Sequence, residues 1–160
     1  LASFYLIPYF DLGIALRADG AGGVSEMCGT VHYLKPGGSS LMSRGVYDVI
    51  SLGEEALRRT APEEYQKRLH EKYVRGIQVD RPAVISINSF FASLAVNELL
   101  ARLHRFRMDG NERFAQHVHS FIHGDVYQEV DGAPFQALAR YVGKGDVVPF
   151  LGQPMFEGVS

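Results

Sequence analysis

A short apolar run that leads directly into a long amphipathic segment constrains this chain more than any other feature. Residues 82–107 read PAVISINSFFASLAVNELLARLHRFR. The run 83–87 is apolar and rich in β-branched residues, which predicts a buried strand. Asn88 or Ser89 then provides a suitable N-cap for a helix. The positions predicted to form the apolar face of that helix are Phe91, Ala92, Leu94, Ala95, Val96, Leu99, Leu100, Leu103 and Phe106.

Two antiparallel hairpins are predicted on either side of this unit. Residues 3–10 form an apolar run typical of a strand covered on both faces. The extended segments 13–18 and 27–35 flank the turn cluster DGAGG and predict the first hairpin. The second hairpin is predicted from 113–122 and 126–130, with its turn at 123–125.

Two short helices are predicted between the first hairpin and the long helix. Ser51 and Glu54 form a capping-box pattern for a helix that continues to Arg58. Thr60 and Glu63 form the same pattern for a second helix. In the second helix, Tyr65, Leu69 and Tyr73 are four residues apart and are expected to lie on one face. Gly76 is expected to end this helix.

Composition narrows the functional classes. The chain has 160 residues, 46% of them hydrophobic, and a net charge of −2, which suits a globular protein with a packed core. No basic stripe dominates, so no nucleic-acid partner is expected. No apolar run reaches the roughly 18 residues of a membrane span, so no membrane partner is expected. The lone Cys28 cannot form an internal disulfide, which favours a cytoplasmic location.

Three stretches of the chain resemble the ThiF/MoeB family, the adenylyltransferases related to ubiquitin-activating enzymes. They are IPYFDLGIAL at 7–16, GTVHYLKPGGSSLMSRG at 29–45 and PAVISINSFFASLAVNELL at 82–100. The resemblance implies an α/β fold with a mixed sheet, in which residues 1–107 form the C-terminal half of a Rossmann-like ThiF/MoeB domain. Residues 108–160 are then a small β-rich, loop-rich appendix, reminiscent of tails on bacterial ThiF-like proteins.

The same resemblance implies an activity. Enzymes of this family bind ATP and Mg²⁺ and adenylate the C-terminal glycine of a ubiquitin-like or sulfur-carrier protein. Their glycine-rich phosphate loop is expected before Leu1, so this chain alone is expected to hold no cofactor and to be inactive. It would supply scaffold, a carrier-docking surface and a homodimer contact. The alternative is a non-catalytic protein-interaction module built on the same half-fold.

Two pairs of residues are candidates for the site that this family implies. Asp11 and Arg17 are expected to line the groove where a carrier tail approaches; the alternative is a turn acid and an exposed strand cation. Ser40 and Ser43 lie where the family often has a Cys-x-x-Cys pair. Serine hydroxyls are weak zinc ligands, so we expect an abolished metal site, or simply a polar turn, and no bound zinc.

Histidine and cysteine give weaker candidates. His117 and His119 share one face of a predicted strand and His123 lies at its turn, a spacing that can bind zinc. Solvent-facing strand histidines are the commoner explanation. Cys28 is a candidate transfer thiol. Its place at a strand start beside Glu26 favours a small, half-buried packing residue instead.

Overall fold

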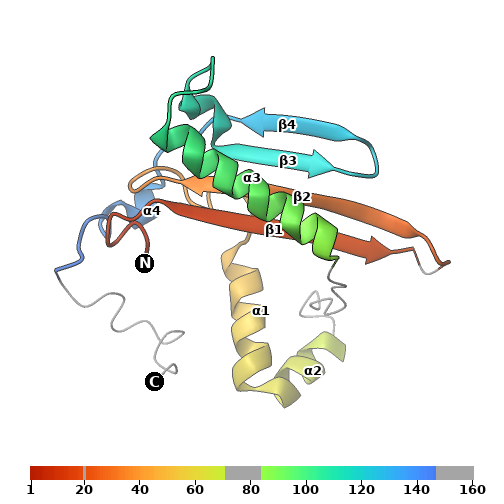
Figure 1. The fold of residues 1–160 in the computed structure, drawn as a ribbon. Helices are drawn as coiled ribbons and strands as arrows, with labels where there is room; N and C mark the ends of the chain where they lie inside the picture. The colour runs from red at the N-terminus through yellow and green to blue at the C-terminus, as the bar shows by residue number, and fades with distance from the viewer. Residues whose placement is uncertain (20, 71–83, 147–160) are drawn as a thin grey trace.

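A four-stranded sheet organises the protein, described here from a computed structural model of residues 1–19, 21–70 and 84–146 (Figure 1). Its strands are β1 (Tyr9–Ala18), β2 (Val24–Leu34), β3 (Gln116–Ser120) and β4 (Asp125–Glu129), in the order β1-β2-β3-β4. All neighbouring strands in this part of the chain are antiparallel. The predicted combination of helices and strands is confirmed, whereas the predicted mixed sheet is wrong.

The β1–β2 hairpin forms because its loop supplies its own hydrogen bonds. The Asp19 carboxylate accepts from the backbone N–H groups of Ala21 and Gly23, at 2.7 and 2.8 Å. Gly22 has a φ of +94°, which an L side chain rarely adopts. The predicted hairpin is therefore confirmed, and it begins earlier, at Tyr9.

The strand predicted at residues 3–10 is largely wrong. Residues 2–6 form a turn, in which the N–H of Ile7 donates to the carbonyl of Ala2 at 2.8 Å. Because these backbone groups are paired locally, they do not enter the sheet, and Tyr9 and Phe10 alone of that run belong to β1.

The second predicted hairpin is confirmed within shorter bounds. β3 pairs with both β2 and β4, with Val31 opposite His117 and His119 opposite Val126. The hairpin expected in a separate appendix thus completes the same sheet as the N-terminal hairpin. The division of the chain after Arg107 stays a prediction.

The strand predicted at 83–87 is wrong for the residues that the structure describes. The long helix α3 (Ile85–Leu103) already includes Ile85, Ser86 and Ile87, and the N–H of Asn88 donates to the carbonyl of Val84 at 3.0 Å. β-branched residues lower helix stability by only some tenths of a kcal/mol each. One further turn of intrahelical hydrogen bonds outweighs that preference. Residue 83 lies outside the described residues.

α3 packs on one face of the sheet, and its buried side differs from the predicted one (Figure 1). Phe91, Glu98 and Ala101 are buried, and the ring of Phe91 rests against the backbone of Gly29. Val96, Leu99, Leu100 and Leu103, all predicted to face the core, are exposed. The hydrophobic pattern failed because the buried side carries a charged residue, Glu98.

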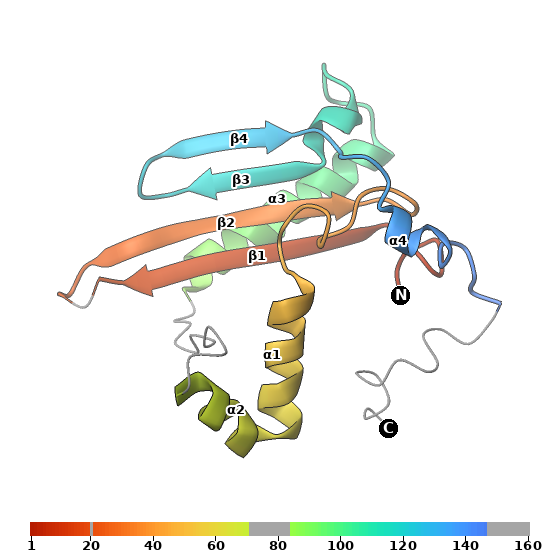
Figure 2. The ribbon, with the colours of Figure 1, turned by 180° about the vertical axis from the view of Figure 1, so that it is seen from behind.

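Two further helices, α1 (Val49–Thr60) and α2 (Pro62–His70), pack against each other beyond the β1 side of the sheet (Figure 2). Both were predicted, although α1 begins earlier because Asp48 rather than Ser51 is its N-cap. Tyr65 is buried as expected, whereas Tyr73 and Gly76 lie outside the described residues. A 3-10 helix η1 (Asn111–Phe114) precedes β3, and a short α4 (Gln136–Ala139) follows the sheet.

None of the helices in the described ranges combines the length and apolar character that a bilayer crossing requires.

Candidate functional site

The outer edge of β1 is unpaired within the described residues. β1 is the first strand of the sheet, and no described strand pairs with its outer side, although α1 and α2 lie beyond this side of the sheet (Figure 2). Ile14 lies opposite Gly29, whose backbone contacts Phe91, so Leu12 and Ile14 face the α3 side. Asp11, Gly13, Ala15 and Arg17 alternate with them and face away. Long unpaired edges of this kind are ready templates for another strand.

The flank of α3 nearest β1 is apolar and exposed. Successive residues turn by about 100° around a helix, so Val96, Leu99 and Leu103 project from one side of α3. Phe90 projects from the opposite side, where its ring lies 4.9 Å from that of His119 in β3. Of the first three, Leu99 lies on the flank toward β1, whereas Val96 and Leu103 lie roughly 140° and 120° around the helix from Phe91 and point away from the sheet. Leu99 together with Leu12 and Ile14 forms what we call the open face, and each of the three is 37–44% exposed.

Asp11 and Arg17 occupy the two ends of the β1 edge. The Asp11 carboxylate accepts a hydrogen bond from the Tyr9 hydroxyl at 3.3 Å. The Arg17 guanidinium donates to Glu26 at 2.9 Å and is 62% exposed. Six residues of strand separate the two side chains by about 20 Å. They share one face of β1 but do not contact each other.

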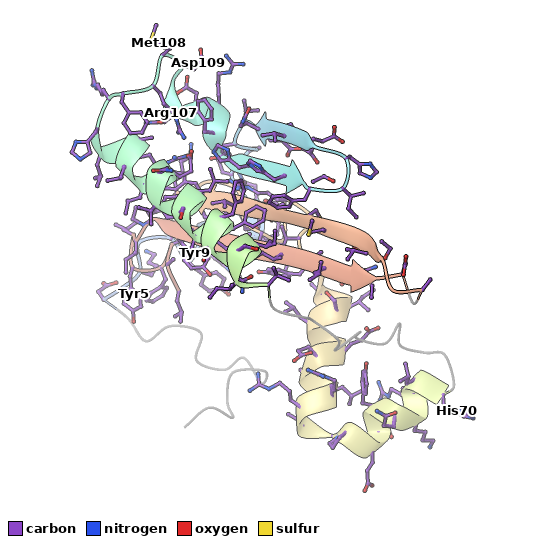
Figure 3. All side chains as sticks on the ribbon, turned by 45° about the vertical axis from the view of Figure 1, so that its right-hand side comes forward. Tyr5, Tyr9, His70, Arg107, Met108 and Asp109 are labelled. Carbon is purple, nitrogen blue, oxygen red and sulfur yellow. The ribbon has the colours of Figure 1, made fainter. Side chains whose placement is uncertain are left out.

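A cleft of about 350 Å³ lies at the start of β1. Its lining is mainly apolar and aromatic, with Tyr9, Leu34, Tyr47 and Tyr141 among the contributors. Figure 3 shows Tyr5 and Tyr9 at this end of the sheet. The size suits a small ligand or a few residues of an extended chain.

Ser40 and Ser43 lie in one tight turn beside this cleft. Ser40 is part of the cleft lining, and Ser43 is not. The N–H of Ser43 donates to the Ser40 hydroxyl at 3.1 Å, and the N–H of Ser40 donates to the Ser43 hydroxyl at 2.9 Å. These reciprocal hydrogen bonds stabilise the turn, which is a sufficient explanation for two serines at this spacing.

Cys28 lies in β2 on the face away from α3, and its sulfur is 3.6 Å from a carboxylate oxygen of Glu26. Burial, followed by the hydrogen bond and charge of Glu26, raises the pKa of this thiol. A transfer thiol needs the opposite environment. The surroundings therefore favour a packing role.

The three candidate histidines have separate surroundings. His117 is buried, contrary to the solvent-facing position expected, and its Nε2 lies 2.7 Å from Glu98. The contact does not have hydrogen-bond geometry. Burial, with the charges of Arg107 and Arg102, lowers the pKa of His117 to about 4. His119 packs among phenylalanine rings and His123 is exposed at the turn.

Among residues 1–19, 21–70 and 84–146, no three His, Cys, Asp or Glu side chains are grouped as a metal site would require. His117 and His119 do share a face, as predicted, but each is engaged by different neighbours.

The sequence reasoning missed a buried ionic group, the Glu98 cluster, formed by Glu98, Arg102, Arg107 and His117. Arg102 donates to Glu98 at 2.5 Å and to the carbonyl of Phe114 at 2.7 Å. Arg107, labelled in Figure 3, contacts both carboxylate oxygens from the loop after α3. The i,i+4 spacing of Glu98 and Arg102 was the available signal.

A second group, the Arg44 cluster, was also missed. The Arg44 side chain donates to the carbonyls of Ala115 and Tyr33 at 3.0 and 2.9 Å and to Asp131 at 2.9 Å. Ser39 joins it by donating to Asp131 at 2.5 Å. This cluster anchors the loop after β2 to the end of the sheet, where the cleft begins.

Comparison of the chain with family models, with curated proteins and with solved structures found no match. The ThiF/MoeB resemblance therefore rests on the three sequence stretches and stays a prediction.

Proposed function

We propose that this chain is the C-terminal, carrier-docking part of a ThiF-like enzyme that adenylates the C-terminus of a ubiquitin-like or sulfur-carrier protein. The observation that carries the proposal is the open face beside the unpaired edge of β1. A surface with Leu12, Ile14 and Leu99 exposed together is typical of a docking site for another folded segment. The nucleotide-binding part of such an enzyme is the occupant we propose.

The local topology is consistent with this assignment. The resemblance of residues 7–16 is to a family segment that enters antiparallel strands, and this segment leads into the antiparallel β1–β2 hairpin. The segment 82–100 resembles a family strand followed by a helix; its described part belongs almost entirely to α3, and the strand is absent from it. α3 covers one face of the sheet, with Leu99 on its flank toward β1 (Figure 1).

The described residues do not fit a nucleotide-phosphate site. α1 begins after Asp48, whose carboxylate would repel phosphate, and α3 begins after Val84, without a glycine-rich turn. The proposal therefore leaves ATP and Mg²⁺ to the partner part. We assign no step of nucleotide chemistry to these residues.

Under this proposal, the chain contributes the surface along which the tail of the carrier protein binds. Asp11 and Arg17 present two opposite charges along the face of β1 that lies away from α3. An extended tail running along an unpaired strand can gain main-chain hydrogen bonds, while charged side chains at either end fix its position. The tyrosine-lined cleft at the start of β1 offers apolar contacts to the same tail.

Binding of a carrier provides the test. A sulfur-carrier protein ending in Gly-Gly is titrated into the chain by calorimetry, beside the same carrier without its last two residues. We expect tail-dependent binding that Asp11→Asn with Arg17→Gln weakens by about tenfold, since two exposed ionic contacts contribute roughly 0.7 kcal/mol each. Glu64→Gln on α2, an exposed ion-pair residue, is the matched control. Equal affinity for the two carriers, or no binding, overturns the proposal.

The alternative, a non-catalytic interaction module, draws on the same open face. It predicts that the chain binds a protein partner without any dependence on a carrier tail. ATP–pyrophosphate exchange by the chain alone is a further check, because measurable exchange would contradict the assignment of the nucleotide site to another segment.

A further inference from the structure

We propose that the side of α3 pointing away from the sheet binds one amphipathic helix of a protein partner, packed antiparallel to α3. The inference goes beyond the proposed function and stands whether or not that function holds. It uses neither the unpaired edge of β1 nor the open face, and it rests on the outer side and the C-terminal end of α3.

A straight apolar stripe runs along the outer side of α3. Phe91 marks the inner side, because its ring rests against Gly29 of the sheet. Positions between about 100° and 180° around the helix from Phe91 are all exposed and follow the spacing i, i+4, i+7, i+11, i+15 and i+18. We call these residues the outer stripe: Ile85, Ser89, Ala92, Val96, Leu100 and Leu103. Its two end residues are 84% and 66% exposed.

No described helix or strand covers the outer stripe. α3 packs on β1 and β2, and in Figure 1 its other side faces away from the sheet. A surface helix ordinarily carries charged residues on its outer side. The only charged residues of α3, Glu98 and Arg102, both belong to the Glu98 cluster on its inner side. An outer side that is apolar and uncharged along its whole length is typical of a surface that another element covers.

The shape of the outer stripe favours a helix as the covering element. The stripe is one residue wide and about 27 Å long. Ser86, Ser93 and Asn97 border it on the side away from Leu99. A sheet presents several parallel rows of side chains and would bury these polar groups without partners. A helix contacts a single row, through its own apolar residues at i, i+3, i+4 and i+7.

Charge at the C-terminal end of α3 favours one direction for the partner helix. Arg102 and Arg107 turn inward to Glu98. Arg105 lies between them in the sequence, is exposed, and has no ion pair among the described residues. Because Asp and Glu are favoured in the first turn of a helix, an antiparallel partner places its acidic turn beside Arg105. The same inward turn of Arg102 and Arg107 leaves α3 without the basic flank that helices on membranes carry.

Side-chain size gives the partner helix a second requirement. The N-terminal half of the outer stripe contains the small residues Ser89 and Ala92, and the C-terminal half contains Val96, Leu100 and Leu103. Helices pack closely where small residues face large ones. We therefore expect a partner that begins with an acidic turn, continues with small apolar residues opposite the large half, and ends with leucines over the small half.

Two designed peptides test the inference. The forward peptide is a helix with Glu in its first turn, Ala in the first half of its apolar stripe and Leu in the second. The reversed peptide has the same residues in the opposite order, and both are stapled to equal helicity. By fluorescence anisotropy, we expect a Kd below about 100 µM for the forward peptide and at least about tenfold weaker binding of the reversed one. No binding, or equal binding of the two, overturns the proposal.

Substitutions separate a shaped site from non-specific apolar adhesion. Val96→Ser should weaken binding of the forward peptide about fivefold. Val126→Ser on β4 is the matched control, because the two valines are 55% and 56% exposed. Ala92→Leu adds apolar area but fills the space needed by the partner's leucines, so it should also weaken binding. Tighter binding by Ala92→Leu, or an equal loss in Val126→Ser, contradicts a shaped site and overturns the proposal.

Two further measurements address the alternative occupants. The chain is sedimented with vesicles of phosphatidylcholine and phosphatidylserine, and its self-association is measured by sedimentation velocity. We expect neither vesicle binding nor a dimer that Val96→Ser abolishes. Vesicle binding lost in this variant would assign the outer stripe to a lipid surface, and a dimer lost in it would assign the stripe to a second copy. Either result overturns a partner helix as the occupant.

Discussion

The Glu98 cluster and the Arg44 cluster are both buried ionic groups beside β3, but their centres have opposite chemistry. Glu98 is a carboxylate held by two guanidinium groups, with the histidine ring of His117 beside it. Arg44 is a guanidinium held by one carboxylate, a hydroxyl and two backbone carbonyls. From this difference we expect that a buried charge held largely by neutral acceptors depends less on any one partner than a charge held by other charges.

Removing the central charge of the Glu98 cluster should have the largest effect. Glu98→Gln leaves Arg102 and Arg107 without a counter-ion in a site where the carboxylate is 1% exposed. We expect a loss of about 3–5 kcal/mol in the free energy of unfolding, measured by urea denaturation. Glu55→Gln removes an exposed pair with Arg58 and should change stability by less than about 0.5 kcal/mol. Similar losses in both variants would contradict the burial of this charge.

The second prediction concerns pH and His117. Its folded-state pKa, about 4, lies below the ordinary 6.5, so the unfolded chain binds more protons between these values. The contribution of His117 to stability is present above pH 6.5 and is lost as pH falls toward 4, by up to about 3 kcal/mol. Free energies of unfolding between pH 4 and 8 measure it.

His32 provides the comparison within the Arg44 cluster. Burial and the charge of Arg44 also lower the pKa of His32. His117→Gln should reduce the loss of stability on acidification more than His32→Gln does. Equal reductions, or a wild-type protein whose stability is flat between pH 5 and 6.5, would refute the assignment to His117.

Removing the centre of the Arg44 cluster should cost less than removing Glu98. Arg44→Met leaves Asp131 with Lys35 at 3.2 Å and with the Ser39 hydroxyl. We expect a loss of about 2 kcal/mol, chiefly from two backbone carbonyls that lose their donor. Thermal and urea unfolding monitored by circular dichroism give the value. A loss as large as that of Glu98→Gln would remove the distinction between the two clusters.

The smallest predicted effects on stability are those of substituting the neighbouring serines Ser39 and Ser40. Ser39 is buried within the Arg44 cluster, whereas Ser40 bonds within its own turn. Ser39→Ala should cost about 1–2 kcal/mol and Ser40→Ala about 0.5 kcal/mol. The reverse order would show that the turn, not the cluster, positions this loop.

Local signals predicted the hairpins and the short helices. Asp19 and its glycines mark the first hairpin, and the cap of α1 was displaced by only three residues, from Ser51 to Asp48. The orientation of α3 was not predictable from hydrophobicity, because its buried side includes Glu98. Glu98 can be buried because Arg102, Arg107 and His117 surround its carboxylate. Arg107 and His117 lie outside α3, so helix periodicity does not encode their contacts.

The candidate site was predictable in part. Asp11 and Arg17 share one face of β1, as strand alternation implies, and the paired serines lie in a polar turn. The α3 part of the open face was not foreseen, because Leu99 was expected to face the core. The Arg44 cluster joins Arg44 to Asp131 across 87 residues, and its geometry follows only from the assembled sheet.

The contact of Phe91 with Gly29 has a mechanical consequence. A side chain at residue 29 would overlap the Phe91 ring, so helix and sheet touch there as closely as backbone allows. The Glu98 cluster fixes α3 again two turns further on. Because α3 is fixed to the sheet at both Phe91 and the Glu98 cluster, its orientation is set before any partner binds, and its apolar flank is preorganised. A partner that covers this flank gains contact without having to reorient the helix, which lowers the entropic cost of association.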